Sequence, residues 1–126
     1  MLHDEVDKML EYANELLGSA EQEMERSHED VVTHLVCMNS RQSIANYLAG
    51  FLIQRKAGVP KPVTLQGLLD KCKEVDARFD TIDLSPIHCR CQSEDNDYCL
   101  EHSQVEDCMR IAQQARSIVM HQTPGY

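Results

Sequence analysis

Residues 86–102, which read PIHCRCQSEDNDYCLEH, bring thiols and imidazoles together at a spacing that could hold a metal ion. Cys89 and Cys91 are separated by one residue, so an extended backbone points both thiols to the same side. Cys99 and His102 are three positions apart, a spacing with which a tight turn offers two ligands to one ion. Four nitrogen and sulfur ligands suit a closed tetrahedral zinc site with a structural role.

The alternative interpretation is a polar loop with incidental thiols, and we favour it. A one-residue spacing strains a chelate, and a helical core of this length does not need a metal to fold. His88 could replace one of the four ligands. We therefore expect no cofactor, with zinc as the alternative. Cys37, Cys72 and Cys108 lie on apolar helical faces, where we expect buried free thiols that act as small hydrophobes.

Basic residues that could contact a phosphate form a second set of candidates. Arg116 and His121 make an Arg-x4-His pair, and five positions on a regular helix rotate by about 140°. They would converge only if the helix loosens before Pro124 or if two subunits share the site. His34 and Arg41 are seven apart and share a helical face. A polar layer, a dimer seam and a ligand pocket all fit them, and we favour the two structural interpretations.

Several catalytic motifs are absent from the sequence. It contains no glycine-rich phosphate loop, no Gly-x-Ser-x-Gly and no His-Glu-x2-His. Carboxylates are plentiful, but none are paired in an apolar setting that would tune them as acid and base. The sequence therefore leaves open whether the protein is an enzyme.

Charge and hydropathy restrict the partners. The net charge is −9, so phosphate repulsion disfavours non-specific DNA binding. Residues 1–30 hold ten acids and two bases, whereas residues 52–78 hold six bases and three acids. We interpret the basic stretch as a solvated face of mixed charge. The N-terminus lacks an apolar signal core, and no apolar run approaches the roughly 20 residues of a membrane span. We expect a cytoplasmic protein without membrane contact, whose cysteines are thiols or metal ligands and not disulfides.

Long helices are indicated by the scarcity of glycine and proline before position 58. An apolar residue recurs every three or four positions over about 2–26, which predicts one amphipathic helix. Two apolar stripes run along a second helix over about 28–56. One consists of Val31, Leu35, Met38, Ala45, Leu48 and Leu52, and the other of Val32, Val36, Ile44, Tyr47 and Phe51. This second helix should be central in a bundle or should also meet a second subunit.

Capping signals place the remaining elements. Gly58 is the expected stop of the second helix, and Thr64 should cap a third helix of about fourteen residues. An irregular segment with one short helical turn follows. Ser103 and Glu106 form a capping box that begins the last helix. We predict a single domain over 1–126, an all-α antiparallel up-and-down bundle of four or five helices with one longer loop before the last helix.

The order of these elements resembles a HEPN domain, the "higher eukaryotes and prokaryotes nucleotide-binding" helical bundle, over about residues 2–121. The stretches RQSIANYLAGFLIQRKAGVPKP, TLQGLLDKC, RCQSEDNDY and VEDCMRIAQQARSIVM resemble the family's long second helix, the helix after its proline link, its Arg-bearing loop and its last helix. The resemblance implies a helical bundle that is usually dimeric. It also implies ribonuclease activity in members with an Arg-x4-6-His motif, which Arg116 and His121 match in spacing.

These considerations lead to three functional hypotheses. The first is a nucleotide- or RNA-associated binding protein that acts as a homodimer, of the toxin–antitoxin or nucleotidyltransferase-partner type, with contacts from His34, Arg41 and Arg90. The second is a metal-independent ribonuclease, in which Arg116 stabilises phosphate charge and His121 moves protons. The third is a zinc-stabilised interaction module without catalysis. We rank them in that order.

Overall fold

The computed structural model describes residues 2–26, 33–61, 63–85 and 102–120, with side chains described for 5–26, 35–61, 63–85 and 106–120. Within these ranges the chain is helical and contains no strand. The elements are α1 (Leu2–Met24), α2 (Thr33–Gln54), α3 (Leu65–Val75), the 3-10 turn η2 (Ala77–Thr81) and α4 (His102–Met120). The expected all-α fold class, a four-helix bundle, is confirmed.

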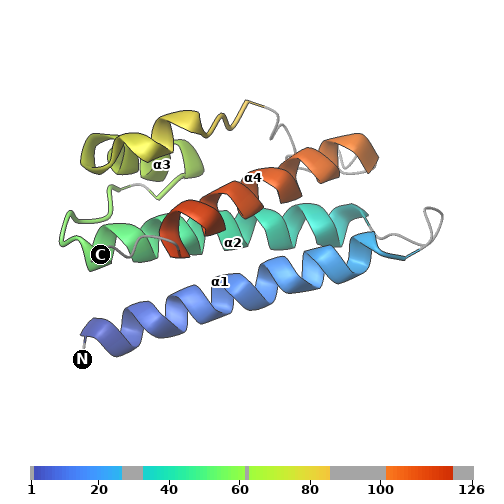
Figure 1. Cartoon of the computed structure of the whole chain (residues 1–126), viewed down its shortest axis with the longest axis horizontal. Helices are drawn as coiled ribbons and strands as arrows, with labels where there is room; N and C mark the ends of the chain where they lie inside the picture. Colours follow the sequence, from blue (N-terminus) through green and yellow to red (C-terminus); the bar gives the residue numbers. More distant parts are fainter. Residues whose placement is uncertain (1, 27–32, 62, 86–101, 121–126) are drawn as a thin grey trace.

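Helix α2 is the centre of the bundle. It packs against α1, α3 and α4, whereas α1 and α3 lie on different sides of it and share no extensive contact. In Figure 1, α1 runs antiparallel to α2, and α4 runs beside α2 in the same direction. This agrees with the two apolar stripes of the sequence, because a helix with three helical neighbours must be apolar on several sides.

The core is built almost entirely from aliphatic side chains. Phe51 and Phe79 are its aromatic pair, with ring centroids 4.8 Å apart in an edge-to-face arrangement. Other buried members come from all four helices and the segment after η2: Val6, Leu10, Ala13, Leu17, Ile44, Tyr47, Leu48, Leu52, Leu68, Leu69, Cys72, Ile82, Leu84, Ile111, Ala112, Ala115 and Val119. A smaller cluster of Ala20, Val36, Cys37 and Cys108 lies between α1, α2 and α4.

The end of α2 differs from the expectation. We expected Gly58 to stop the helix. Gly58 is left-handed, at φ 82°, but the helix has already ended at Lys56, which is left-handed at φ 58°. The amide of Lys56 donates to the carbonyl of Ile53 at 3.0 Å, and the amide of Ala57 donates to that of Leu52 at 2.9 Å. This pair of bonds is a Schellman motif, which usually has glycine at the left-handed position.

Helix α3 begins where the sequence predicts but ends earlier. Thr64 is its N-cap, and the Thr64 hydroxyl accepts a hydrogen bond from the Gly67 amide at 2.9 Å. The helix has 11 residues, not about fourteen, because Asp76 turns to an extended backbone. The Asp76 carboxylate then caps η2 by accepting from the amide of Arg78. The predicted short helical turn is thus confirmed as η2.

Two further expectations concern the start of α4 and the presence of membrane-spanning helices. Helix α4 already contains Ser103, which we expected to lie just before it, and the Ser103 side chain lies outside the described set. In the parts of the chain that the structure describes, no helix combines the length and the apolar character needed to cross a membrane.

Candidate functional site

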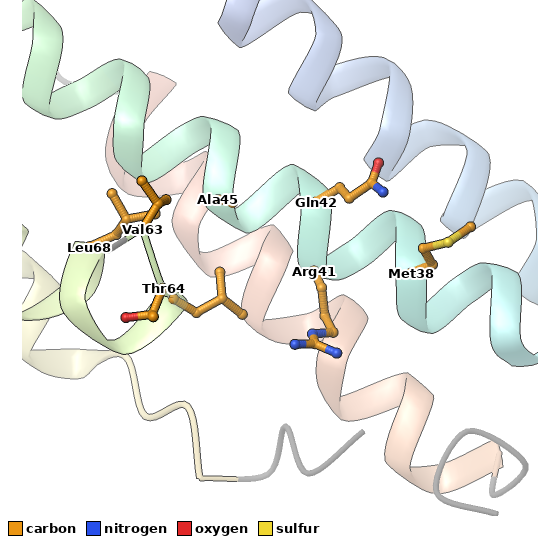
Figure 2. A pocket seen from close by; sticks show the side chains of 8 residues that line it. Met38, Arg41, Gln42, Ala45, Val63, Thr64 and Leu68 are labelled. Atoms are coloured by element: carbon orange, nitrogen blue, oxygen red, sulfur yellow. The ribbon is translucent and has the colours of Figure 1, made fainter. Parts of the chain in front are cut away.

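A groove of about 530 Å³ opens where the first half of α2 meets the start of α3. Its lining combines apolar side chains with a single charged residue, Arg41. The full set is Met38, Arg41, Gln42, Ala45, Val63, Thr64, Leu65 and Leu68. Figure 2 shows Arg41 extending to the side of α2 on which Thr64 lies, whereas Gln42 extends to the other side, towards α1. The groove volume is in the range of small-molecule sites.

Two local features of the chain form this groove. On α2, Met38, Arg41 and Ala45 are spaced by three and four positions, so they follow one edge of the helix. On the opposite wall, the extended backbone of Thr64 (φ −133°, ψ 157°) turns directly into α3. The start of α3, with its first amides and the positive end of its dipole, therefore borders the groove.

Arg41 brings the charge of a guanidinium to one end of the groove. The charge of Arg41 also reaches α4, because it lowers the pKa of the Cys108 thiol against the larger effect of burial, which raises that pKa to about 11. The wall opposite Arg41 carries a helix N-terminus and no acid, since Val63, Thr64, Leu65 and Leu68 are all uncharged. A guanidinium beside a helix N-terminus favours an anion.

The remaining lining suits an apolar body attached to that anion. Met38, Ala45, Leu65 and Leu68 offer aliphatic surface, and Val63 is 59% exposed at the rim. Gln42 adds an amide that can donate and accept hydrogen bonds. The groove can hold a ligand, but its described residues include no nucleophile with an adjacent base.

The predicted ligand contacts are only partly placed by the structure. Arg41 lines the groove. This position is compatible with the ligand pocket, one of the three interpretations of the His34 and Arg41 pair. His34 lies in α2, but its side chain is outside the described set, as is Arg90. Ser40, the neighbour of Arg41, is fully buried, and its hydroxyl has no hydrogen-bond partner among the described residues. Ser40 and Arg41 therefore occupy different environments.

The structure places Arg116 at the interface of α1 and α4. The Arg116 Nη2 atom lies 3.4 Å from Glu21 Oε2, and Gln113 Nε2 donates to the same oxygen at 2.8 Å. Tyr47 is nearby: burial raises the pKa of its phenol to about 12, with smaller opposite effects of Arg116 and Glu21. The Tyr47 hydroxyl donates to Asn14 Oδ1. His121 lies outside the described residues, so the Arg-x4-His pair stays a prediction.

The zinc hypothesis is also left as a prediction. In the described segments, no group of three or more His, Cys, Asp or Glu side chains could hold a metal ion. Cys89, Cys91 and Cys99 fall outside the described residues, and so does the side chain of His102.

The cysteine expectation is wrong for Cys37. Cys37 is fully buried, as predicted, but it is disulfide-bonded. Cys72 and Cys108 are the expected buried free thiols, so neither of them is its partner. Local patterning could show only that Cys37 faces inwards, because a disulfide depends on which distant sulfur the fold brings within bonding distance.

Sequence reasoning missed most of the groove. Thr64 was recognised only as a helix cap, and Met38 only as a member of an apolar stripe. No local signal shows that the start of α3 lies beside the middle of α2. The link between the two helices, GVPKPV, was the available clue, because a short link keeps the two helices close together.

Comparisons with known proteins add no identification. No family model, no curated protein and no solved structure matches the chain.

Proposed function

We propose that this protein binds nucleotides in the groove between α2 and α3. The observation that carries the proposal is the position of Arg41 and of the α3 N-terminus at the edge of one apolar groove. A nucleotide has the two matching parts, an anionic phosphate and a flat base with large apolar faces. In this proposal the phosphate contacts Arg41 and the first amides of α3, and the base lies against Met38, Ala45 and Leu65.

Arg41 is the residue on which recognition of the phosphate depends. A hydrogen bond to a charged group contributes about 1.5–3 kcal/mol, which corresponds to roughly 10- to 100-fold in affinity. Replacement of Arg41 by glutamine keeps a polar side chain of similar length and removes the charge. Arg110 provides a matched control, because it is an exposed arginine on α4 that pairs with Asp107, and neither residue lines the groove.

Isothermal titration of the whole chain with AMP, ATP, GTP and a short single-stranded RNA tests the proposal. We expect at least one nucleotide to bind, Arg41→Gln to weaken that binding by roughly 10-fold or more, and Arg110→Gln to leave it unchanged. Ala45→Leu, which narrows the groove from its α2 wall, should also weaken it. No heat of binding at millimolar nucleotide, or equal losses in the two arginine variants, would refute the assignment.

A further inference from the structure

One face of α2 carries a surface that shares Met38, Gln42 and Ala45 with the proposed nucleotide groove and extends beyond it at both ends. The residues Leu35, Met38, Gln42, Ala45, Ala49 and Ile53 follow one another at steps of three and four, so they form a single stripe along α2. We call this set the outer stripe. Five of its six members are apolar, and none of the six is buried.

The arrangement of the helices leaves this stripe partly accessible: Leu35 and Gln42 are exposed, whereas Ala45, Ala49 and Ile53 are partly buried and pack against the core. The buried residues of α2, among them Ile44, Tyr47 and Phe51, belong to the core that α2 shares with its helical neighbours. Met38, Gln42 and Ala45 lie on the side of α2 that looks away from α4 (Figure 2). Because α1 and α3 flank α2 without extensive contact between them, the outer stripe runs along the floor between two helical walls.

The α1 wall adds a groove of its own beside the stripe. Its volume is about 390 Å³, and its lining is Ser19, Gln22, Glu23, Arg26, Leu35 and Asn39. Tyr12 lies seven positions before Ser19 on the same face of α1, and its side chain is 50% exposed. Leu35 is 39% exposed. Large exposed apolar side chains on one face mark an interaction surface more often than scattered ones do.

Charge selects the kind of partner. Helix α1 contains seven acids and one lysine, and Glu15 lies one turn from Ser19 at the edge of the groove. A second copy of the chain would bring another net charge of −9, with its own acidic α1, against this face. Like charges oppose that association, and a basic partner is attracted.

We propose that the outer stripe, together with the groove along α1, binds a basic amphipathic helix of a partner protein. The apolar face of that helix contacts Leu35, Met38 and Ala45, and its basic edge lies along α1 beside Glu15. The stripe extends over eighteen residues from Leu35 to Ile53, about 27 Å of helix, so a partner helix of about five turns covers it. The proposal does not rest on nucleotide binding, because it does not use Arg41, but the two ligands share Met38 and Ala45 and should therefore compete.

A synthetic helical peptide tests the surface directly. The probe has eighteen residues, leucine on one helical face and lysine elsewhere, and carries a fluorophore for anisotropy titration with the full chain. A second peptide has the same composition in an order that breaks the helical period, so it keeps the charge and loses the apolar face. We expect the ordered peptide to bind at least about 10-fold tighter than the shuffled one. Equal affinities would reduce the interaction to charge alone and overturn the proposal.

Matched variants locate the binding surface. Leu35 and Met120 are 39% and 42% exposed, and Met120 lies on α4. We expect Leu35→Ser to weaken binding of the ordered peptide several-fold and Met120→Ser to leave that binding unchanged. Glu15→Lys and Asp80→Lys change the net charge equally, but Asp80 is exposed on η2, which contacts α3 and α4. Only Glu15→Lys should therefore weaken binding beyond the general effect of charge. Equal effects within either pair would overturn the proposal.

Two further measurements complete the test. They are the mass of the chain in solution and the binding of both ligands to a variant of the nucleotide groove. If light scattering finds a dimer that Leu35→Ser dissociates, a second copy covers the stripe and the proposal is wrong. Arg41→Gln distinguishes the two interactions, since it should weaken nucleotide binding by roughly 10-fold or more and leave peptide binding in place. Loss of both interactions in Arg41→Gln would show that the peptide depends on Arg41 and would also contradict the proposal.

Discussion

Arg116 on α4 lies 3.4 Å from the carboxylate of Glu21 on α1, although the two residues are 95 positions apart along the chain. Gln113, one turn earlier on α4, donates to the same carboxylate oxygen. Glu21 thus connects α1 to two successive turns of α4. Both members of the ion pair are about one-third exposed, so solvent screens their attraction.

The first prediction concerns the energy of this connection. Glu21→Ala removes two partners and Arg116→Ala removes one, so the first should lower the free energy of unfolding by about 1 kcal/mol and the second by less. Urea unfolding of both variants and of the double variant gives the coupling energy between the two side chains, which should be about 0.2–1 kcal/mol. A coupling energy of zero, or a larger loss of stability in Arg116→Ala than in Glu21→Ala, would show that the ion pair does not stabilise the protein in solution.

The second prediction concerns the strained end of α2. Lys56 adopts φ 58°, a conformation that costs a residue with a β-carbon about 1 kcal/mol relative to glycine. Lys56→Gly should therefore raise the free energy of unfolding by about 0.5–1 kcal/mol, as measured by urea unfolding.

Arg55 supplies the control for that substitution. It precedes Lys56, has no positive φ, and its guanidinium lies 4.8 Å from the Phe51 ring centroid. Arg55→Gly should therefore destabilise the protein, because glycine gains nothing there and the contact with Phe51 is lost. If both glycine variants change stability in the same direction, the strain at Lys56 is not the cause.

The third prediction compares two glycines inside helices. A β-carbon added to Gly18 on α1 would meet no atom within 4 Å, whereas one added to Gly50 on α2 would lie 2.9 Å from Leu10 Cδ2. Gly18→Ala should stabilise the protein by about 0.5–1 kcal/mol through the higher helix propensity of alanine. In Gly50→Ala, displacement of the buried Leu10 side chain should offset that gain. Thermal unfolding measures both, and equal gains would contradict the close approach of α1 and α2 at Gly50.

The fourth prediction is a loss of stability at alkaline pH. Burial raises the pKa of the Cys72 thiol from 9.0 to about 12, with a smaller contribution from Asp76, and the thiol donates to the carbonyl of Leu48 at 3.6 Å. Above pH 9 the unfolded chain releases this proton while the folded chain keeps it. The stabilisation is therefore complete below pH 9 and is lost as pH rises towards 12.

Comparison with Cys72→Ala isolates this effect from the other groups that titrate in the same range. The variant should be less stable than the natural protein at pH 8 because it leaves a small cavity. Its stability should then fall less steeply between pH 9 and pH 10.5. Urea midpoints at several pH values give both slopes, and parallel slopes would mean that the thiol of Cys72 does not titrate differently in the two states.

The elements of the fold were accessible from local patterns. The apolar period predicted α1, α2 and α4, and the Thr64 cap marked the start of α3, because helix formation and capping depend on residues within one or two turns. The early end of α3 was not predicted. The Asp76 carboxylate accepts hydrogen bonds from the amide and the guanidinium of Arg78, and these local bonds compete with another turn of α-helix. Hydrophobic periodicity does not reveal this competition.

The candidate site was accessible only in part. The sequence singled out Arg41 because a cation on a largely apolar helix is unusual, and the structure places it in the groove lining, where its contact with a ligand stays a prediction. Its neighbours in the groove, Val63 to Leu68, lie some twenty positions later in the chain. The sequence contained no pattern that joins the two segments, and the same holds for the contact between Glu21 and Arg116.

The sequence by itself therefore determined which segments become helices, which side of each helix is apolar, and that α2 is apolar on more than one side. The tertiary structure alone decided that α4 packs on one of those sides, that the outer stripe stays partly exposed, and that Arg41 lines the same groove as the start of α3. The physical reason is the range of the interactions. Helical period and capping are set by neighbours in the chain, whereas grooves, ion pairs between helices and disulfides depend on how whole helices pack.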